Sequence, residues 1–406
     1  MNLTNMDPKS GCPLTEESLL ATLSPEDRSR LLSDNLTGKW WYKGWATLLK
    51  CYREDEDLTM AGRMIIETRW TEVLQNRLAI AGKLPLVDVS KCPINRPIFI
   101  IGPCRTGTTF LLNLLYQDPN NTSPRYYETM HPVVEKPTAR EDPRVEAERK
   151  ALTEMYEAVP KVKAMHNIVA DNPYECFRLM DNCGIFKANT LLTNHPEEYL
   201  AWLNSLTEEE KEDAYRFHKL QIQLILLSRG SDDINKQLVF KESTHSLYLA
   251  AILKVYPDAT FIHTYRDPCE AIASLCSIAE SFKGLGYDPV NLDLKKLGEN
   301  MVSIPLFHSG FNMMAFRKSH PEEEHRFCDI AYSDIVADPL NVVKRIYDRF
   351  GLELTAEGEA IMTAYIKNNP QNKYGQHQHS LERYQLTKEY ILEYFKEYIE
   401  FSEVRC

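Results

Sequence analysis

The sequence predicts an α/β fold, in which a central parallel β-sheet carries a phosphate-binding loop and is surrounded by many helices. Three short runs are the expected strands, at residues 98–101, 237–241 and 259–265. They are apolar or rich in β-branched and aromatic side chains, which is typical of strands buried on both faces. Helical spacing follows the first run and separates the second from the third. This strand–helix–strand alternation favours parallel pairing.

The rest of the chain is predicted to be mostly helical. Residues 1–95 have apolar helical spacing and are expected to form an N-terminal extension packed on the core. The main domain then spans residues 96–406 and contains a helical insertion at about 135–235, where strand signals are few. The aromatic run Trp40–Trp45 is most simply interpreted as packing between helices, with a pocket lining or a membrane contact as the alternatives.

Composition excludes several classes of protein. A net charge of −11 over 406 residues argues against a general nucleic-acid binder, and no apolar run is long enough to predict a transmembrane helix. The first residues lack the basic and apolar segments of a signal peptide. Ten cysteines occur without CxxC pairs or Cys/His zinc spacing, so we expect reduced thiols, a cytoplasmic location and no metal site.

The strongest motif follows the first predicted strand. Gly102 and Gly107 bracket a short loop, and Thr108 and Thr109 begin an apolar helical segment. Backbone N–H groups at such a helix N-terminus bind phosphate. The loop nearly fits the nucleoside-triphosphate pattern G-x-x-x-x-G-K-[ST], but Thr108 replaces the lysine. Since the cation is instead Arg105, inside the loop, the sequence predicts an anion site that differs from that of an ordinary ATPase.

Two further cations follow the other predicted strands. Lys241 ends the second, and Arg266 directly follows the third. Ligands bind at the carboxyl edge of parallel sheets, so both side chains are expected near the loop. Ser274 lies two turns into the next helix, about 12 Å along the axis from Arg266. A long arginine folded along the helix could share one anion with that hydroxyl.

In this order, the parts resemble sulfotransferases that use 3′-phosphoadenosine 5′-phosphosulfate (PAPS), in particular the bacterial-type branch. Residues 105–109, Arg-Thr-Gly-Thr-Thr, are similar to the branch's [KR]-[ST]-G-T-T loop, and Lys241, Arg266 and Ser274 follow as in that family. The resemblance covers roughly residues 40–400. It implies a P-loop-like fold and transfer of a sulfuryl group to a hydroxyl, less often an amine, of a small-molecule acceptor, without a metal.

The resemblance also implies roles for individual residues. Sulfuryl transfer needs cations where charge grows on the departing nucleotide, and Arg105 and Lys241 are the expected catalytic cations. The 3′-phosphate would be held by Arg266 and Ser274, with Lys373 and His377 closing over it. The 5′-phosphosulfate would be held by Arg105, Thr106, Gly107, Thr108 and Thr109.

The general base that removes the acceptor proton is left open between two residues. Glu128 lies about twenty residues after the loop, where several sulfotransferase branches place a catalytic glutamate. His245 lies close to Lys241, near the histidine of cytosolic sulfotransferases. Glu242 and Ser243 depart from the Ser-Pro pair usual after the lysine, and a carboxylate beside Lys241 would neutralise part of its charge.

Two other functions are consistent with the loop. One is a nucleoside-triphosphate-dependent kinase or NTPase, which the missing loop lysine and the lack of an evident magnesium-binding aspartate disfavour. The other is a sulfotransferase-like protein that binds nucleotide without catalysis, which Glu242 beside Lys241 favours. Acceptor identity and oligomeric state do not follow from the sequence.

Overall fold

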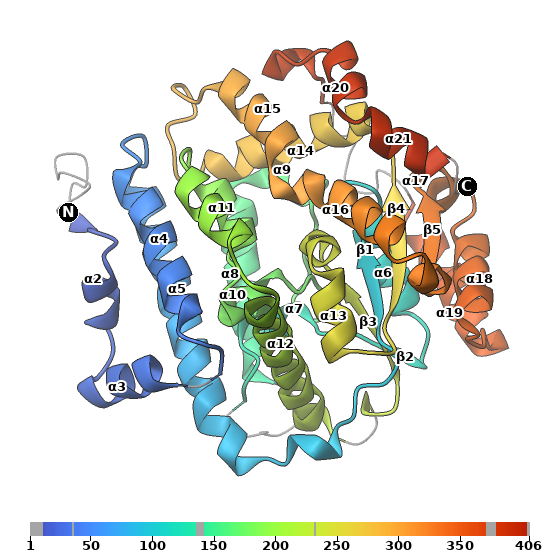
Figure 1. Cartoon of the computed structure of the whole chain (residues 1–406), viewed down its shortest axis with the longest axis horizontal. Coiled ribbons are helices and arrows are strands. Elements are labelled where there is room, and N and C mark those ends of the chain that lie inside the picture. The colour runs from blue at the N-terminus through green and yellow to red at the C-terminus, as the bar shows by residue number, and fades with distance from the viewer. Residues whose placement is uncertain (1–10, 35, 135–141, 231–232, 371–378, 404–406) are drawn as a thin grey trace.

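The computed structural model describes residues 11–34, 36–134, 142–230, 233–370 and 379–403. Its centre is one five-stranded sheet in the order β2-β3-β1-β4-β5, and every neighbouring pair is parallel (Figure 1). The strands are β1 Ile98–Ile101, β2 Asn121–Thr122, β3 Gln237–Lys241, β4 Thr260–Tyr265 and β5 Phe327–Ala331. The predicted α/β class with a parallel sheet is confirmed.

The central strand β1 is buried on both faces, as its unbroken apolar sequence predicted. Successive side chains of a strand point to opposite faces. Phe99 and Ile101 belong to the core shared with the N-terminal helices, whereas Ile98 and Ile100 belong to the core on the opposite face. Helices therefore cover the sheet on both sides, which leaves its carboxyl edge for a ligand.

Two strands were not predicted from the sequence. β2 has only two residues, too few for any periodicity, and it forms because Asn121 and Thr122 pair with Gln237 and Leu238. The apolar sequence of β5 is interrupted by Asp329, and aspartate is more typical of loops than of strands. In the fold the Asp329 carboxylate lies 2.7 Å from the His263 ring on the neighbouring strand.

The N-terminal helices pack on the core without a separate hydrophobic centre. The aromatic run begins α4, and Trp40, Trp41 and Trp45 are all buried, so helix packing is the correct interpretation of that run. Their cluster continues to Phe99 and Phe240 of the sheet. The helices are α2 Glu16–Leu20, α3 Pro25–Ser33, α4 Trp40–Glu54 and α5 Met60–Lys83, followed by the 3₁₀ turns η2 Leu84–Leu86 and η3 Val89–Lys91.

Helices also fill the chain between β1 and β3. The longest of these begins at Thr207, whose side chain and that of Glu210 form a capping box. The elements are α6 Thr108–Leu115, α7 Tyr126–Met130, α8 Pro143–Ala158, α9 Pro160–Met165, α10 Phe177–Cys183, η4 Lys187–Leu192, α11 Glu197–Asn204 and α12 Glu208–Arg229.

The C-terminal half returns twice to the sheet and ends in a helical layer. The Asp338 carboxylate accepts the N–H of Asn341 at the start of α18, and Gly351 ends that helix at a φ of 64°. The elements are η6 Ser243–Leu247, α13 Leu249–Val255, α14 Pro268–Lys283, α15 Leu294–Ser303, α16 Pro305–Ser319, η7 Pro321–Arg326, α17 Tyr332–Ala337, α18 Pro339–Phe350, α19 Ala356–Asn368, η8 Glu382–Tyr384, α20 Lys388–Tyr394 and α21 Lys396–Glu403. Within the described ranges, no helix has the length and hydropathy that crossing a membrane requires.

Candidate active site

The loop after β1 needs glycine at both ends. Gly102 has a φ of 119°, and a Cβ there would lie 2.3 Å from the carbonyl oxygen of Thr264. Gly107 has a φ of 88° and begins α6, with the Tyr332 ring only 3.0 Å from where a Cβ would be. Arg105 also has a positive φ, 70°, which is uncommon for a residue with a side chain. The loop therefore holds Arg105 in a conformation that the surrounding structure must impose.

Thr106 ties this loop to the neighbouring strand. Its hydroxyl oxygen lies 2.8 Å from the Pro103 carbonyl oxygen, to which it donates, and 2.6 Å from the hydroxyl oxygen of Thr264 on β4. The side chain is buried. Thr106 thus contributes to the site by fixing the loop, whereas Thr108 and Thr109 lie on the wall of a cavity.

This cavity, of about 390 Å³, is lined by the loop and by residues that follow β3 and β4. We call it the central cavity. The fold brings six of the predicted site residues to its wall: Arg105, Gly107, Thr108, Thr109, Lys241 and Arg266. The same wall also includes Glu175, Glu242 and His166, and of these the carboxylate of Glu242 was expected beside Lys241. Burial lowers the pKa of His166 to about 4, so this imidazole is neutral near pH 7.

Arg105 is the point where three segments meet. Its Nε donates to the hydroxyl of Ser274 at 2.9 Å, and an Nη donates to the carbonyl of Met165 at 3.3 Å. Arg266 donates to the carbonyl of Arg105 at 3.2 Å, and its guanidinium stacks 4.3 Å from the Tyr332 ring centre. Burial lowers the pKa of Arg105, but a guanidinium remains charged at neutral pH. Arg266 and Ser274, predicted as a pair, are thus both adjacent to Arg105.

Lys241 lies in an acidic environment that the sequence revealed only in part. Its ammonium forms an ion pair with Glu175, which lies two residues before the start of α10. Burial opposes ionisation of Glu175, but the charge and hydrogen bond of Lys241, together with the nearby His166 and a hydrogen bond from Glu242, outweigh it and lower the pKa of this carboxyl. Burial first, and the Glu175 charge second, raise the pKa of Glu242 to about 8. Near neutral pH the structure therefore holds one ionised and one mainly protonated carboxyl beside Lys241.

Glu128, one of the two predicted candidates for the base, is held by contacts between helices. It lies outside the described residues that line the central cavity, on the first turn of α7. Its carboxylate forms a buried ion pair with Arg229 at the end of α12, and it also accepts the backbone N–H of Arg125 at 2.8 Å. Both oxygens are engaged because this carboxylate caps one helix and binds the end of another. That placement does not support its role as the base.

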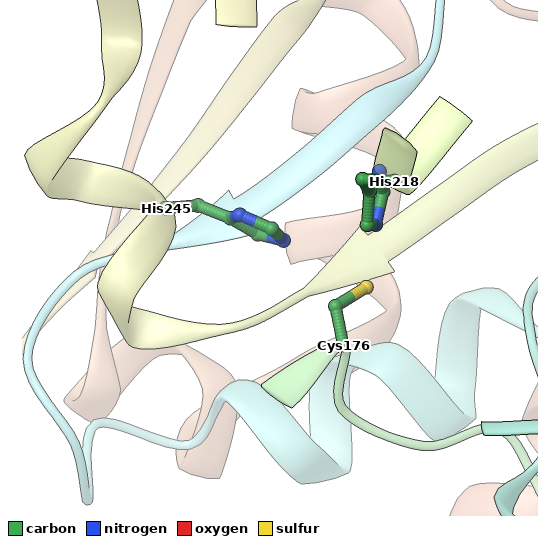
Figure 2. A group of neighbouring side chains, drawn as sticks. All are labelled: Cys176, His218 and His245. Carbon is green, nitrogen blue, oxygen red and sulfur yellow. The ribbon is translucent and has the colours of Figure 1, made fainter. Parts of the chain in front are cut away.

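His245 is likewise absent from the described wall of the cavity and lies in the core (Figure 2). Its Nδ1 is 2.8 Å from the Tyr215 hydroxyl, and its ring packs edge-on against Phe99. Burial holds the pKa of His245 well below its usual range, so the ring stays neutral. The placement of His245 therefore does not support a direct catalytic role either, because aromatic residues separate it from solvent.

Figure 2 shows His245 beside His218 and Cys176. One potential ligand atom from each lies within 4.8 Å of the others, and all three residues are buried. The Nε2 atoms of both rings have no hydrogen-bond partner among the described residues. Sulfur and imidazole nitrogen are a donor set for zinc or copper. However, burial raises the pKa of Cys176 above its usual range, which disfavours the thiolate that would bind such an ion.

The last two predicted nucleotide contacts cannot be placed. Lys373 and His377 lie outside the described residues. Of the residues that the sequence analysis missed, Glu175 carries no local signal. It lies within the predicted helical insertion, 66 positions before Lys241, and only the fold brings the two side chains together.

Comparison with known proteins identifies the class that this fold and cavity define. The model of the sulfotransferase family matches residues 97–356, so the chain belongs to the sulfotransferase family. The resemblance seen in the motifs is confirmed. The match includes β1 through the start of α19, and hence every predicted site residue except Lys373 and His377.

Particular relatives are mycobacterial. The chain is 27% identical over 268 residues to the omega-hydroxy-beta-dihydromenaquinone-9 sulfotransferases Stf3 of Mycobacterium bovis and Mycobacterium tuberculosis. The match covers 63% of this chain and only 63% of each relative. Among solved structures, sulfotransferase STF9 from Mycobacterium avium has a TM-score of 0.80 at 25% identity, with 98% of both chains covered. Sulfotransferase STF1 from Mycobacterium tuberculosis has a TM-score of 0.76 at 25% identity, covering 94% of this chain and 98% of that one.

Proposed function

We propose that this chain transfers a sulfuryl group from PAPS to a hydroxyl group of a small-molecule acceptor. The observation that carries the proposal is the composition of the central cavity. A glycine-bracketed loop at a helix N-terminus faces Lys241 and Arg266 there, at the carboxyl edge of a parallel sheet. Backbone donors and fixed cations are what a polyanionic nucleotide requires.

The donor would be held by residues from three segments. Thr108, Thr109 and the loop N–H groups would bind the 5′-phosphosulfate, and Arg266 the 3′-phosphate. Thr106 and Ser274 support this arrangement, because the first fixes the loop and the second orients Arg105. Lys373 and His377 remain proposed contacts of the 3′-phosphate.

The reaction then depends on positioning and charge stabilisation. The acceptor oxygen forms a bond to sulfur as the bond between sulfur and the bridging oxygen of PAPS breaks. The electron pair of that bond leaves with the nucleotide, and Arg105 stabilises the negative charge that develops there. Lys241 stabilises the charge on the transferring group. No other co-reactant is needed.

The acceptor hydroxyl must also lose its proton. We assign that proton to the Glu175 carboxylate, because this side chain lines the central cavity and is ionised beside Lys241. Glu242 has a raised pKa and would stay protonated, so that it adds no second negative charge beside Lys241. In this proposal the sequence-based candidates, Glu128 and His245, do not accept the proton. They would stabilise the packing of α7 and η6 instead.

Three observations support the acceptor, the cellular location and the kind of partner in this proposal. The curated relatives are named for an omega-hydroxy substrate, which is consistent with transfer to oxygen. The nine cysteines among the described residues are free thiols, as in a reducing compartment such as the cytoplasm. The acidic net charge of −11 disfavours nucleic acid as a partner.

The donor site is tested by titrating the protein with 3′-phosphoadenosine 5′-phosphate while following its thermal unfolding. A ligand specific for the folded state raises stability with the logarithm of its concentration, so the melting temperature should rise. The Arg266→Ala variant should lose most of this shift, whereas Arg149→Ala, on an exposed face of α8, should retain it. A shift seen only with ATP and Mg²⁺ would refute the proposal and favour an NTPase. Nucleotide binding without sulfation of any acceptor would indicate the non-catalytic alternative.

A further inference from the structure

A second cavity, of about 550 Å³, adjoins the central cavity. The two share five wall residues: Arg69, Tyr174, Phe177, Leu192 and Phe282. We call the second cavity the side corridor. It runs between α5 and the end of α14, since Ile66 and Leu285 face it from those two segments. The two cavities are therefore adjacent, and these five side chains form their common boundary.

The walls of the side corridor are mostly apolar. Ile168 and Phe282 contribute apolar surface, and Tyr126, Tyr174 and Phe177 form a continuous aromatic wall. The ring of Tyr174 packs edge-on against Tyr126, with ring centres 4.8 Å apart, and against Phe177, with centres 5.9 Å apart. Such contacts hold the wall rigid and present ring surface to the ligand.

The charged side chains in the side corridor already have partners on the protein. Carboxylates compensate the charges of Arg69 and Arg178, and Lys283 donates to two neutral oxygens, so few polar groups of the corridor are left for a polar ligand. The pairs are Arg69 with Asp181 at 2.9 Å, Arg178 with Glu72 at 3.8 Å, and Lys283 with Asn194 at 2.7 Å.

Apolar side chains also line the side corridor where it reaches solvent. Met64 and Ile65, on the outer part of α5, are 49% and 41% exposed and belong to its wall. Large apolar side chains grouped at the opening of an apolar cavity mark a site for an apolar ligand. They would cover the part of a ligand that emerges from the corridor.

We propose that the side corridor binds the apolar chain of the acceptor, so that the acceptor is an amphiphile with its hydroxyl near the end of a slender hydrocarbon chain. The hydroxyl lies in the central cavity beside Glu175 and Lys241, and the chain extends past Phe177 and Phe282 toward Met64. The identity of the reacting group rests on the proposed function. The site for the chain rests on the corridor alone. A sugar acceptor would fit poorly, because its hydroxyls would be desolvated against aromatic and aliphatic walls.

The test uses the full chain with PAPS and a series of primary alcohols from 1-butanol to 1-decanol. The kcat/KM for sulfation should rise by about fourfold for each added methylene while the chain fills the corridor, the ratio that ~0.8 kcal/mol per buried CH₂ gives. The double variant Met64→Glu/Ile65→Glu should lower the ratio of kcat/KM for 1-decanol over 1-butanol by roughly tenfold or more. Both substitutions are at exposed positions and should fold. The matched control Leu86→Glu, 77% exposed on η2, should keep the wild-type ratio.

A second measurement does not depend on turnover. Equilibrium dialysis of radiolabelled 1-decanol, with 3′-phosphoadenosine 5′-phosphate saturating, should show retention by the wild type and much less by the double variant. Sulfation of all chain lengths at equal kcat/KM would overturn the corridor proposal while leaving the sulfotransferase function intact. Retention of 1-decanol without sulfation would support the corridor and count against hydroxyl transfer. If 1-decanol is neither retained nor sulfated, the corridor proposal fails, and the nucleotide titration alone decides the donor site.

Discussion

At the scale of single residues, the central cavity depends on side chains that restrain one another. Ser274 and the Met165 carbonyl accept hydrogen bonds from Arg105, and Arg266 donates to the backbone of Arg105. Lys241 is restrained by Glu175. A cation whose orientation is set before the substrate arrives loses less entropy when it binds the developing charge.

Glu242 provides a prediction of pH dependence. Its folded-state pKa is raised from 4.5 to about 8, so the folded chain binds this proton more tightly than the unfolded chain. The free energy of unfolding should therefore fall as pH rises from about 4.5 to about 8, and level off above that. In Glu242→Gln, which mimics the protonated acid and cannot ionise, this contribution to the fall should be absent.

Urea unfolding of both proteins at about pH 5 and about pH 9 checks this. The stability of Glu242→Gln relative to the wild type should be greater at the higher pH. The same difference at both pH values would contradict a raised pKa at this residue.

At the scale of elements, the position of the glycine-bracketed loop depends on contacts between early and late parts of the chain. Gly107 begins α6 against Tyr332, the first residue of α17. Away from the described wall of the central cavity, Glu128 joins α7 to α12 through Arg229. We therefore expect Glu128 to stabilise the packing of these two helices.

The Glu128→Ala variant should therefore destabilise the fold. Removing the Glu128 carboxylate breaks its charged hydrogen bonds to the buried Arg229, which keeps Asp233 as an acidic partner, so the loss should be about 1.5–3 kcal/mol of unfolding free energy. The matched control is Glu146→Ala on α8, because Glu146 pairs with Arg149 at an exposed site and should lose less than about 1 kcal/mol. Denaturant unfolding measures both. An unchanged stability with a large fall in kcat would instead restore Glu128 as a candidate base.

At the scale of the whole molecule, the N-terminal helices and the sheet share one hydrophobic core. Tryptophans 40, 41 and 45 of α4 belong to the same buried cluster as Phe99 of β1 and Phe240 of β3. Segments that share a core are expected to unfold together. The boundary predicted near residue 95 thus marks a change of secondary structure within one core.

All five tryptophans lie in α4, α5 or α11, so their fluorescence reports on these three helices. Binding of 3′-phosphoadenosine 5′-phosphate reports on the sheet edge. We expect both signals to be lost at the same urea concentration, together with the far-ultraviolet circular dichroism. If the tryptophan fluorescence changes at a clearly lower urea concentration while nucleotide binding persists, the helices that carry the tryptophans unfold independently of the sheet.

The sequence by itself determined the fold class, the glycine-bracketed loop after β1 and the positions of Arg105, Lys241 and Arg266 at strand ends, because strands, glycine turns and helix starts leave local patterns of apolar spacing and backbone preference. Only the tertiary structure decided the surroundings of those cations. Glu175 lies beside Lys241, Ser274 beside Arg105 and Arg229 beside Glu128 because distant segments meet at the sheet. The side corridor likewise forms where α5 and α14, which are far apart in the chain, come together. Charge pairing and cavity shape depend on these long-range contacts, which no local pattern encodes.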